Sequence, residues 1–172
     1  MSTMLHDSSI AAFVSRLQTL AHLLTRGAEK IEPAVLVGLR LAPDMHPLAR
    51  QVQFVCHQAL DAAAWLSGGT PHVADTPDET LEQLQRRIAG AIAALQDIPA
   101  AALEGGEDRV VRRPLGEQFT LEMSGARYLR DFTLPNLYFH LVTTYAILRS
   151  HGVDLGKRDY MGHILDALRP AQ

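Results

Sequence analysis

Two polar side chains interrupt a long apolar segment near the end of this 172-residue sequence. Asn136 and His140 stand four residues apart there, and positions i and i+4 of a helix share one face. An imidazole in such a place can bind a metal, move a proton or fill the core. A third polar residue, Gln53, lies at the edge of an apolar arc earlier in the chain, where it could face a pocket. We therefore take Gln53, Asn136 and His140 as the candidate ligand-binding residues.

His140 also has a purely structural interpretation. A stable transition-metal site needs three or four ligands, mostly histidine, cysteine or carboxylate, and Asn136 is a poor one. A buried neutral imidazole needs a hydrogen-bond partner, which Asn136 or a backbone carbonyl freed by Pro135 would supply. We predict no metal or other cofactor, and a divalent metal at His140 is the weaker alternative. The catalytic residues are unknown, and whether the protein is an enzyme is left open.

The other reactive side chains do not form a catalytic set. Cys56 and His57 are neighbours, so on a helix they point about 100° apart and cannot form a dyad. The pattern places Cys56 towards the apolar side of its helix and His57 away from it, at the surface. A Cys56–His140 pair across two helices is the one arrangement left open. The sequence contains no G-x-S-x-G elbow and no dinucleotide fingerprint.

Composition limits the class of protein. Hydrophobic residues make up 47% and charged residues 20% of the chain, as in an ordinary globular domain with a real core. A net charge of -3 offers no basic excess for phosphates, so nucleic acid is not an expected partner. The single cysteine fits a reducing cytosol, and no apolar run reaches the roughly 18 residues of a membrane helix. We expect a cytoplasmic, non-membrane protein with one domain over residues 1–172.

Apolar side chains at helical spacing predict four long helices. They are expected over about residues 8–26, from 44 or 46 to 66, from 76 to 98, and from 124 to 152. Asp44 is the expected cap of the second helix. The stretch "TPDE" predicts a capping box for the third, with Thr76 as cap and Glu79 closing the box. The tail after residue 152 is expected to add one short helix.

The pattern changes to a period of two before the last helix. Phe119, Leu121 and Met123 alternate with polar residues, which predicts a β-hairpin over about residues 108–123. Ser124 can then cap the last helix. That helix is apolar around much of its circumference, so we expect it to be deeply buried.

Pro135 lies inside the last helix and should kink it near Asp131, because proline removes a backbone donor. Helices with core-facing stripes and short links form bundles. The predicted fold is therefore an all-α, up-and-down four-helix bundle with a small hairpin between helices 3 and 4.

Three stretches carry a resemblance to a known group of proteins. They are "RLAPDMHPLARQVQ", "NLYFHLVTTYAILRSHGVDLGKRDYMG" and the "EGGEDR" turn. With the order of elements, they resemble an uncharacterised bacterial family within the DinB/YfiT-like helical bundle superfamily. The resemblance runs over nearly the whole chain and implies a DinB-like bundle. The family itself has no assigned activity, so the resemblance implies no particular reaction.

The resemblance also implies where a metal would sit. The wider superfamily holds a divalent metal with three histidines, one on helix 2 and two, four apart, on helix 4. Aligning on the "LR..G" ending puts His140 at the second helix-4 ligand and Asn136 at the first. The helix-2 ligand falls near Gln53 or Phe54, and His57 could replace it only with a shift of register. The expected metal site is therefore degenerate.

Two functions of different classes follow. The first is a small-ligand-binding or cryptic non-catalytic bundle with a pocket lined by Gln53, Asn136 and His140. The alternative is a metal-dependent enzyme of the superfamily's kind, a thiol transferase or hydrolase. One histidine where three are expected favours the first. A small molecule is the expected partner, and a homodimer is a possible assembly.

Overall fold

The computed structural model describes residues 4–69, 71 and 78–169. Its α-helices are α1 (Met4–His6), α2 (Ala12–Ala28), α3 (Pro33–Leu36), α4 (Leu48–Ser67), α5 (Leu81–Gln96), α6 (Gly125–Arg127), α7 (Leu134–Ser150) and α8 (Lys157–Tyr160). The π-helical turns η1 (Asp7–Ala11) and η3 (Tyr128–Thr133) join α1 to α2 and α6 to α7, and the 3-10 helices are η2 (Ala100–Leu103) and η4 (Gly162–Ala167). The strands are β1 (Val110–Leu115) and β2 (Phe119–Ser124).

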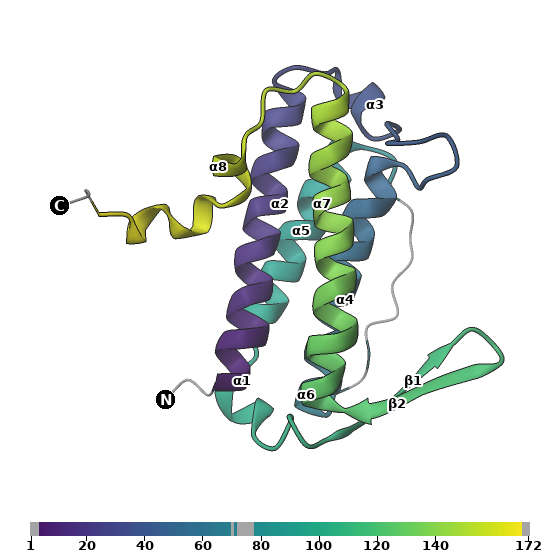
Figure 1. Cartoon of the computed structure of the whole chain (residues 1–172), viewed down its shortest axis with the longest axis vertical. Coiled ribbons are helices and arrows are strands. Elements are labelled where there is room, and N and C mark those ends of the chain that lie inside the picture. Colours follow the sequence, from purple (N-terminus) through teal and green to yellow (C-terminus); the bar gives the residue numbers. More distant parts are fainter. Residues whose placement is uncertain (1–3, 70, 72–77, 170–172) are drawn as a thin grey trace.

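The long helices form an up-and-down bundle, with the hairpin projecting from one end (Figure 1). α4 packs against α7 and α5, and α2 packs against α5 and α7. β1 and β2 pair antiparallel, with Val110 opposite Ser124 and Leu115 opposite Phe119. The predicted bundle with a hairpin before the last helix is confirmed.

Apolar stripes explain the bundle. The core is built from side chains of every long helix and includes Phe13, Leu17, Leu20, Val52, Leu66, Leu84, Ile88, Leu141 and Leu148, all at most 1% exposed. α4 ends at Gly68, whose φ of 73° lies in the left-handed region that glycine adopts without strain. Within the described residues, no helix is long and apolar enough to cross a membrane.

Two predicted helix starts are wrong. Asp44 is exposed and α4 begins at Leu48, with Pro47 in the cap position and its carbonyl accepting from the next turn. The chain before Leu48 is thus not yet helical, which leaves Asp44 too far away to cap. Thr76 lies outside the described residues, but the capping box of α5 is made by Thr80 and Gln83, so Glu79 does not close it. Both errors concern competing caps only a few residues apart.

The last helix differs from the prediction in two ways. The segment near Asp131, where we expected a kink, is the π-helical turn η3, which ends at Thr133, two residues before Pro135. Ser124 caps the helix start as predicted, because its hydroxyl accepts from the amide of Arg127. Deep burial on every side is wrong, however, since Phe139 is 59% and Val142 47% exposed. One apolar face of α7 therefore points to solvent.

The foot of the hairpin is fixed by close backbone contact. A Cβ on Gly125 would overlap the carbonyl oxygen of Gly106, so only glycine fits there. The amide of Gly125 donates to the carbonyl of Arg109, and the Arg109 guanidinium donates to the carbonyl of Leu66 at the end of α4. A cation at a helix C-terminus is favourable, so Arg109 ties the hairpin to α4.

Candidate functional site

His140 is half-buried on α7 and bonds across to α4. Its Nδ1 lies 2.7 Å from Oε1 of Gln51, an acceptor, so Nδ1 carries the proton. The Gln51 amide nitrogen in turn donates to the carbonyl of His46 at 3.1 Å. Burial, with a smaller contribution from His46, lowers the pKa of His140 to about 4. The imidazole is therefore neutral at pH 7 and held by an uncharged partner.

Aromatic rings surround the same imidazole. The ring centre of Phe54 lies 4.5 Å from that of His140, and the ring centre of Phe139 lies 5.2 Å from it. His46 approaches Phe54 edge-on at 5.4 Å, and the Arg50 guanidinium lies 4.5 Å from the Phe54 ring centre. Of the two positions that the resemblance offers for a helix-2 ligand, Gln53 and Phe54, it is Phe54 that lies next to His140, with an apolar ring.

The three candidate residues do not bond to one another. Gln53 accepts from Arg50 at 2.9 Å and donates to the Asp78 carboxylate at 3.2 Å, on the α5 side of the bundle. Asn136 donates to the carbonyl of Phe132 in its own helix at 2.6 Å. His140 was expected to pair with Asn136 or with a freed carbonyl, and its partner is Gln51 instead. Spacing along one helix gave no information about partners on the facing helix.

The other reactive candidates are accounted for by burial. Cys56 is 1% exposed in the core, and desolvation raises the pKa of its thiol to about 12. A thiol that stays protonated is a poor nucleophile. Across residues 4–69, 71 and 78–169, no three His, Cys, Asp or Glu side chains are grouped so that they could hold a metal ion.

The structure contains a buried polar cluster that we did not predict from the sequence. Asp61 on α4, Arg113 on β1 and Tyr128 on η3, with His57 beside them, form what we call the Arg113 cluster. One Oδ2 atom of Asp61 lies 3.1 Å from the Arg113 guanidinium and accepts from the Tyr128 hydroxyl at 3.1 Å. Arg113 also donates to the Tyr128 oxygen at 3.0 Å and lies 3.4 Å from Nε2 of His57. His57 is thus half-buried beneath the hairpin, and its placement at the surface is wrong.

The Arg113 cluster ties the hairpin to the bundle rather than presenting reactive groups. Side-chain exposure is 6% for Asp61 and 16% for Arg113. Burial and the neighbouring Asp61 raise the pKa of Tyr128, so its hydroxyl remains a donor. The guanidinium also lies 4.9 Å from the Phe132 ring centre. A sequence signal existed: Asp61 stands inside the apolar stripe of α4, where a carboxylate needs a cationic partner.

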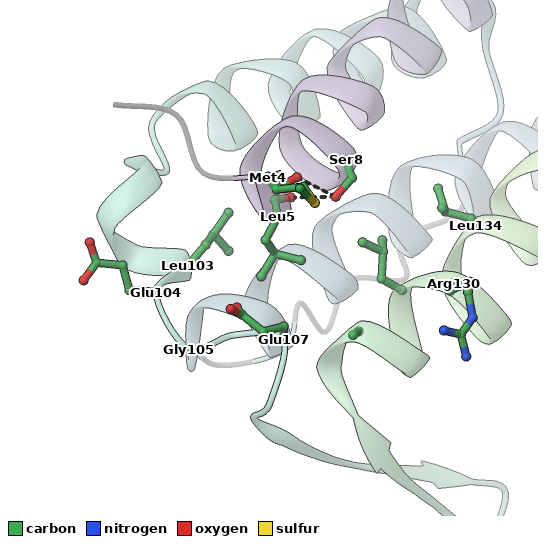
Figure 2. Close-up of a pocket in the computed structure, with 11 residues that line it drawn as sticks. Met4, Leu5, Ser8, Leu103, Glu104, Gly105, Glu107, Arg130 and Leu134 are labelled. Atoms are coloured by element: carbon green, nitrogen blue, oxygen red, sulfur yellow. Dashed lines mark hydrogen bonds between the residues drawn. The ribbon is translucent and has the colours of Figure 1, made fainter.

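A mostly apolar cavity lies at the end of the bundle that carries the N-terminal helix. This end pocket has a volume of about 560 Å³ and lies between α1, η2 and the α6–η3 segment (Figure 2). Its apolar lining is Met4, Leu5, Leu103, Ala126, Leu129 and Leu134. Its polar lining is Ser8, Glu104, Glu107 and Arg130, with Gly105 between the acids. Three segments far apart in the sequence meet here, which no local pattern could predict.

Comparison with known proteins agrees with this architecture. A solved structure described as a DinB family member from Shewanella denitrificans superposes with a TM-score of 0.83 at 31% identity. The match covers 98% of this chain and 95% of that one, so the chain is a DinB-like helical bundle. The chain belongs to the family described as domain of unknown function DUF1993, whose model matches residues 5–161. No curated protein matches the sequence.

Proposed function

We propose that this protein is a non-catalytic bundle that binds a small molecule in the end pocket. The observation that carries the proposal is the apolar cavity of about 560 Å³ at the meeting of α1, η2 and η3. Small-molecule sites are typically concave, mostly apolar and roughly 300–1,000 Å³ in volume, with a few polar groups. The buried Leu103 and Leu129 form the apolar floor, and Met4 lies at the exposed edge.

The end pocket does not include the three residues that the sequence suggested as a ligand site. Gln53, Asn136 and His140 each make a hydrogen bond to another protein group. A ligand bound to all three would have to break those bonds and would gain little in exchange. Their arrangement instead supports a degenerate metal position, because Phe54 and Asn136 stand where two further ligands would be needed.

A metal-dependent thiol transferase or hydrolase is the competing function. It requires at least three protein ligands, and among the described residues His46 is the histidine that lies near enough to influence His140. The bond from Nδ1 of His140 to Gln51 leaves Nε2 for a metal, as in metal-binding histidines generally, so the shortage of further ligands is the argument against a metal. No observation in the described part of the chain favours the enzyme over the binding protein.

The proposal is tested with a neutral fluorescent probe, naphthylethanol, titrated into the wild-type protein. Ala126 lines the end pocket from an exposed position, so Ala126→Trp fills the cavity without disturbing the core. Ala93→Trp on the exposed side of α5 is the matched control. We expect saturable binding that Ala126→Trp abolishes and Ala93→Trp leaves intact. Absence of binding, or equal binding by both variants, would contradict the proposal.

We also propose that two copies associate through the exposed face of α7. This face is uncharged and consists of Tyr138, Phe139, Val142, Thr143 and Ala146, with Leu41 from the segment before α4 beside them. Two such faces can therefore meet without like-charge repulsion, and their burial is favourable. Light scattering should give the mass of a dimer, and Val142→Glu should halve it. A monomeric wild-type protein would contradict this assembly.

The cytoplasm is the proposed location, supported by the single, deeply buried thiol of Cys56. Fractionation of cells that express the tagged protein tests this. Recovery outside the cytoplasmic fraction would contradict it.

A further inference from the structure

The polar groups around the end pocket divide into bonded and unbonded ones. The Ser8 hydroxyl lies 2.8 Å from the carbonyl of Met4 and 3.2 Å from that of Leu5, so its proton is directed to the backbone. The Arg130 guanidinium is held by Asp131, with its Nε and Nη2 at 2.7 and 3.0 Å from the carboxylate oxygens. The Ser8 proton and two of the Arg130 nitrogens are therefore already engaged by protein groups.

The two acids of the pocket are different. Glu104 and Glu107 are exposed, and neither side chain makes an ion pair or a hydrogen bond with the rest of the described residues. In Figure 2 Glu104 lies at one edge of the pocket next to Leu103, Glu107 lies nearer the middle with its carboxylate turned towards that edge, and Arg130 lies at the opposite end. The charged lining residues are these two carboxylates and the single guanidinium of Arg130, so the net charge of the pocket lining is negative.

We propose that the end pocket binds an amphipathic amine: an apolar body of aromatic or aliphatic carbon that ends in a protonated amino group. This inference rests on the proposed function and names its ligand class. The apolar body contacts Leu103, Leu129 and Leu134, and the ammonium group donates hydrogen bonds to Glu104 and Glu107.

The two carboxylates determine which ligands the pocket prefers and by how much. A carboxylate is acceptor-only at neutral pH, so it satisfies an ammonium group and repels a ligand carboxylate. Exposed ion pairs contribute modestly, about 0.2–1 kcal/mol each. Two such pairs raise the affinity for an amine over a neutral analogue by about twofold to thirtyfold. The apolar contacts, shared by every analogue, supply the remainder.

Three probes of equal ring size test the inference: naphthylethylamine, naphthylethanol and naphthylacetate. They carry charges of opposite sign or none, while the apolar part is the same. At low salt we expect the amine to bind most tightly, the alcohol about twofold to thirtyfold more weakly, and the acid weakest. Raising the salt concentration to 1 M should bring the three affinities together, because exposed charges are screened.

Substitutions that remove the negative charge show which residues cause the preference for the amine. The double variant Glu104→Gln and Glu107→Gln should remove the advantage of the amine and leave the affinity for the alcohol unchanged. Glu117→Gln, an exposed acid in the hairpin turn, is the matched control with the same type of change. It should leave all three affinities as in the wild-type protein.

The outcomes separate the two proposals. If the three probes bind equally well to the wild-type protein and none binds to Ala126→Trp, the proposed binding function stands and the proposed preference for an amine is wrong. An amine preference that survives in the double glutamine variant would also overturn it. If no probe binds, or if Ala126→Trp changes nothing, the proposed function itself fails and the inference fails with it.

Discussion

Replacing Arg113 with methionine tests how the hairpin is attached to the bundle. The substitution keeps the apolar part of the side chain and removes the guanidinium. Asp61, at 6% side-chain exposure, then keeps the Tyr128 hydroxyl as its partner in the cluster but loses the positive charge. Breaking a buried ion pair from one side typically costs about 3–5 kcal/mol. At roughly 2–4 °C per kcal/mol for a chain of this size, Tm should fall by about 6–20 °C.

The neighbouring residue supplies the control. Arg112 pairs with Glu122 on the exposed face of the same hairpin, where the two side chains are 65% and 58% exposed. Exposed pairs contribute about 0.2–1 kcal/mol, so Arg112→Met should lower Tm by no more than about 4 °C. Adding Asp61→Asn to Arg113→Met should recover part of the loss, because the uncompensated charge disappears. Thermal and urea unfolding of the four proteins measure this, and equal effects of the two methionine variants would refute the buried ion pair.

Four further predictions concern the residues around His140 and the core. His140→Ala should cost about 1–4 kcal/mol in urea unfolding, and combining it with Gln51→Ala should be less than additive, since the two share one hydrogen bond; strict additivity would argue against the pair. The pKa of His140 falls from 6.5 to about 4 on folding, so the stability that its neutral form contributes is complete above pH 6.5 and is lost as pH falls towards 4. His140→Gln should therefore make the free energy of unfolding less dependent on pH between these values. A pH dependence equal to that of the wild-type protein would contradict the pKa shift. The Cys56 thiol, with a pKa of about 12, should resist alkylation at pH 8 in the folded protein and react after unfolding, whereas rapid labelling of the native state would show that it is accessible. Elemental analysis of protein purified without added metal should find less than stoichiometric zinc or nickel. One metal ion per chain that is lost in His140→Ala would instead support the metal-dependent enzyme.

Local patterns were sufficient for the architecture. The period of two at Phe119, Leu121 and Met123 placed the hairpin within two residues of its observed strands. Ser124 was identified as a helix cap because its side chain and the following amides are neighbours in sequence. Such features depend on interactions between residues a few positions apart, which the sequence displays directly.

The candidate site was predicted less well, since its contacts link distant residues. His140 and Asn136 share a helix, but the partner of His140 is Gln51, 89 positions earlier. The pair of Asp61 with Arg113 joins a helix to a strand, and the pattern of either element alone says nothing about the other. Side-chain partners across a bundle depend on helix rotation and crossing angle, which small differences in packing decide.

The end pocket illustrates the same limit. Its floor combines Leu103, in η2, with Leu129, in η3, and its edge is Met4 at the start of the chain. Each residue has an ordinary explanation in its own segment. Only the assembled bundle shows that they enclose a cavity.

A crystal structure of the protein soaked with naphthylethylamine is the most direct test of the binding function. If the end pocket binds this amine, we expect electron density for the naphthyl ring between Leu103, Leu129 and Leu134, with the amino group near Glu104 and Glu107. Density for the probe beside His140 and Gln53 instead, with the end pocket empty, would contradict it.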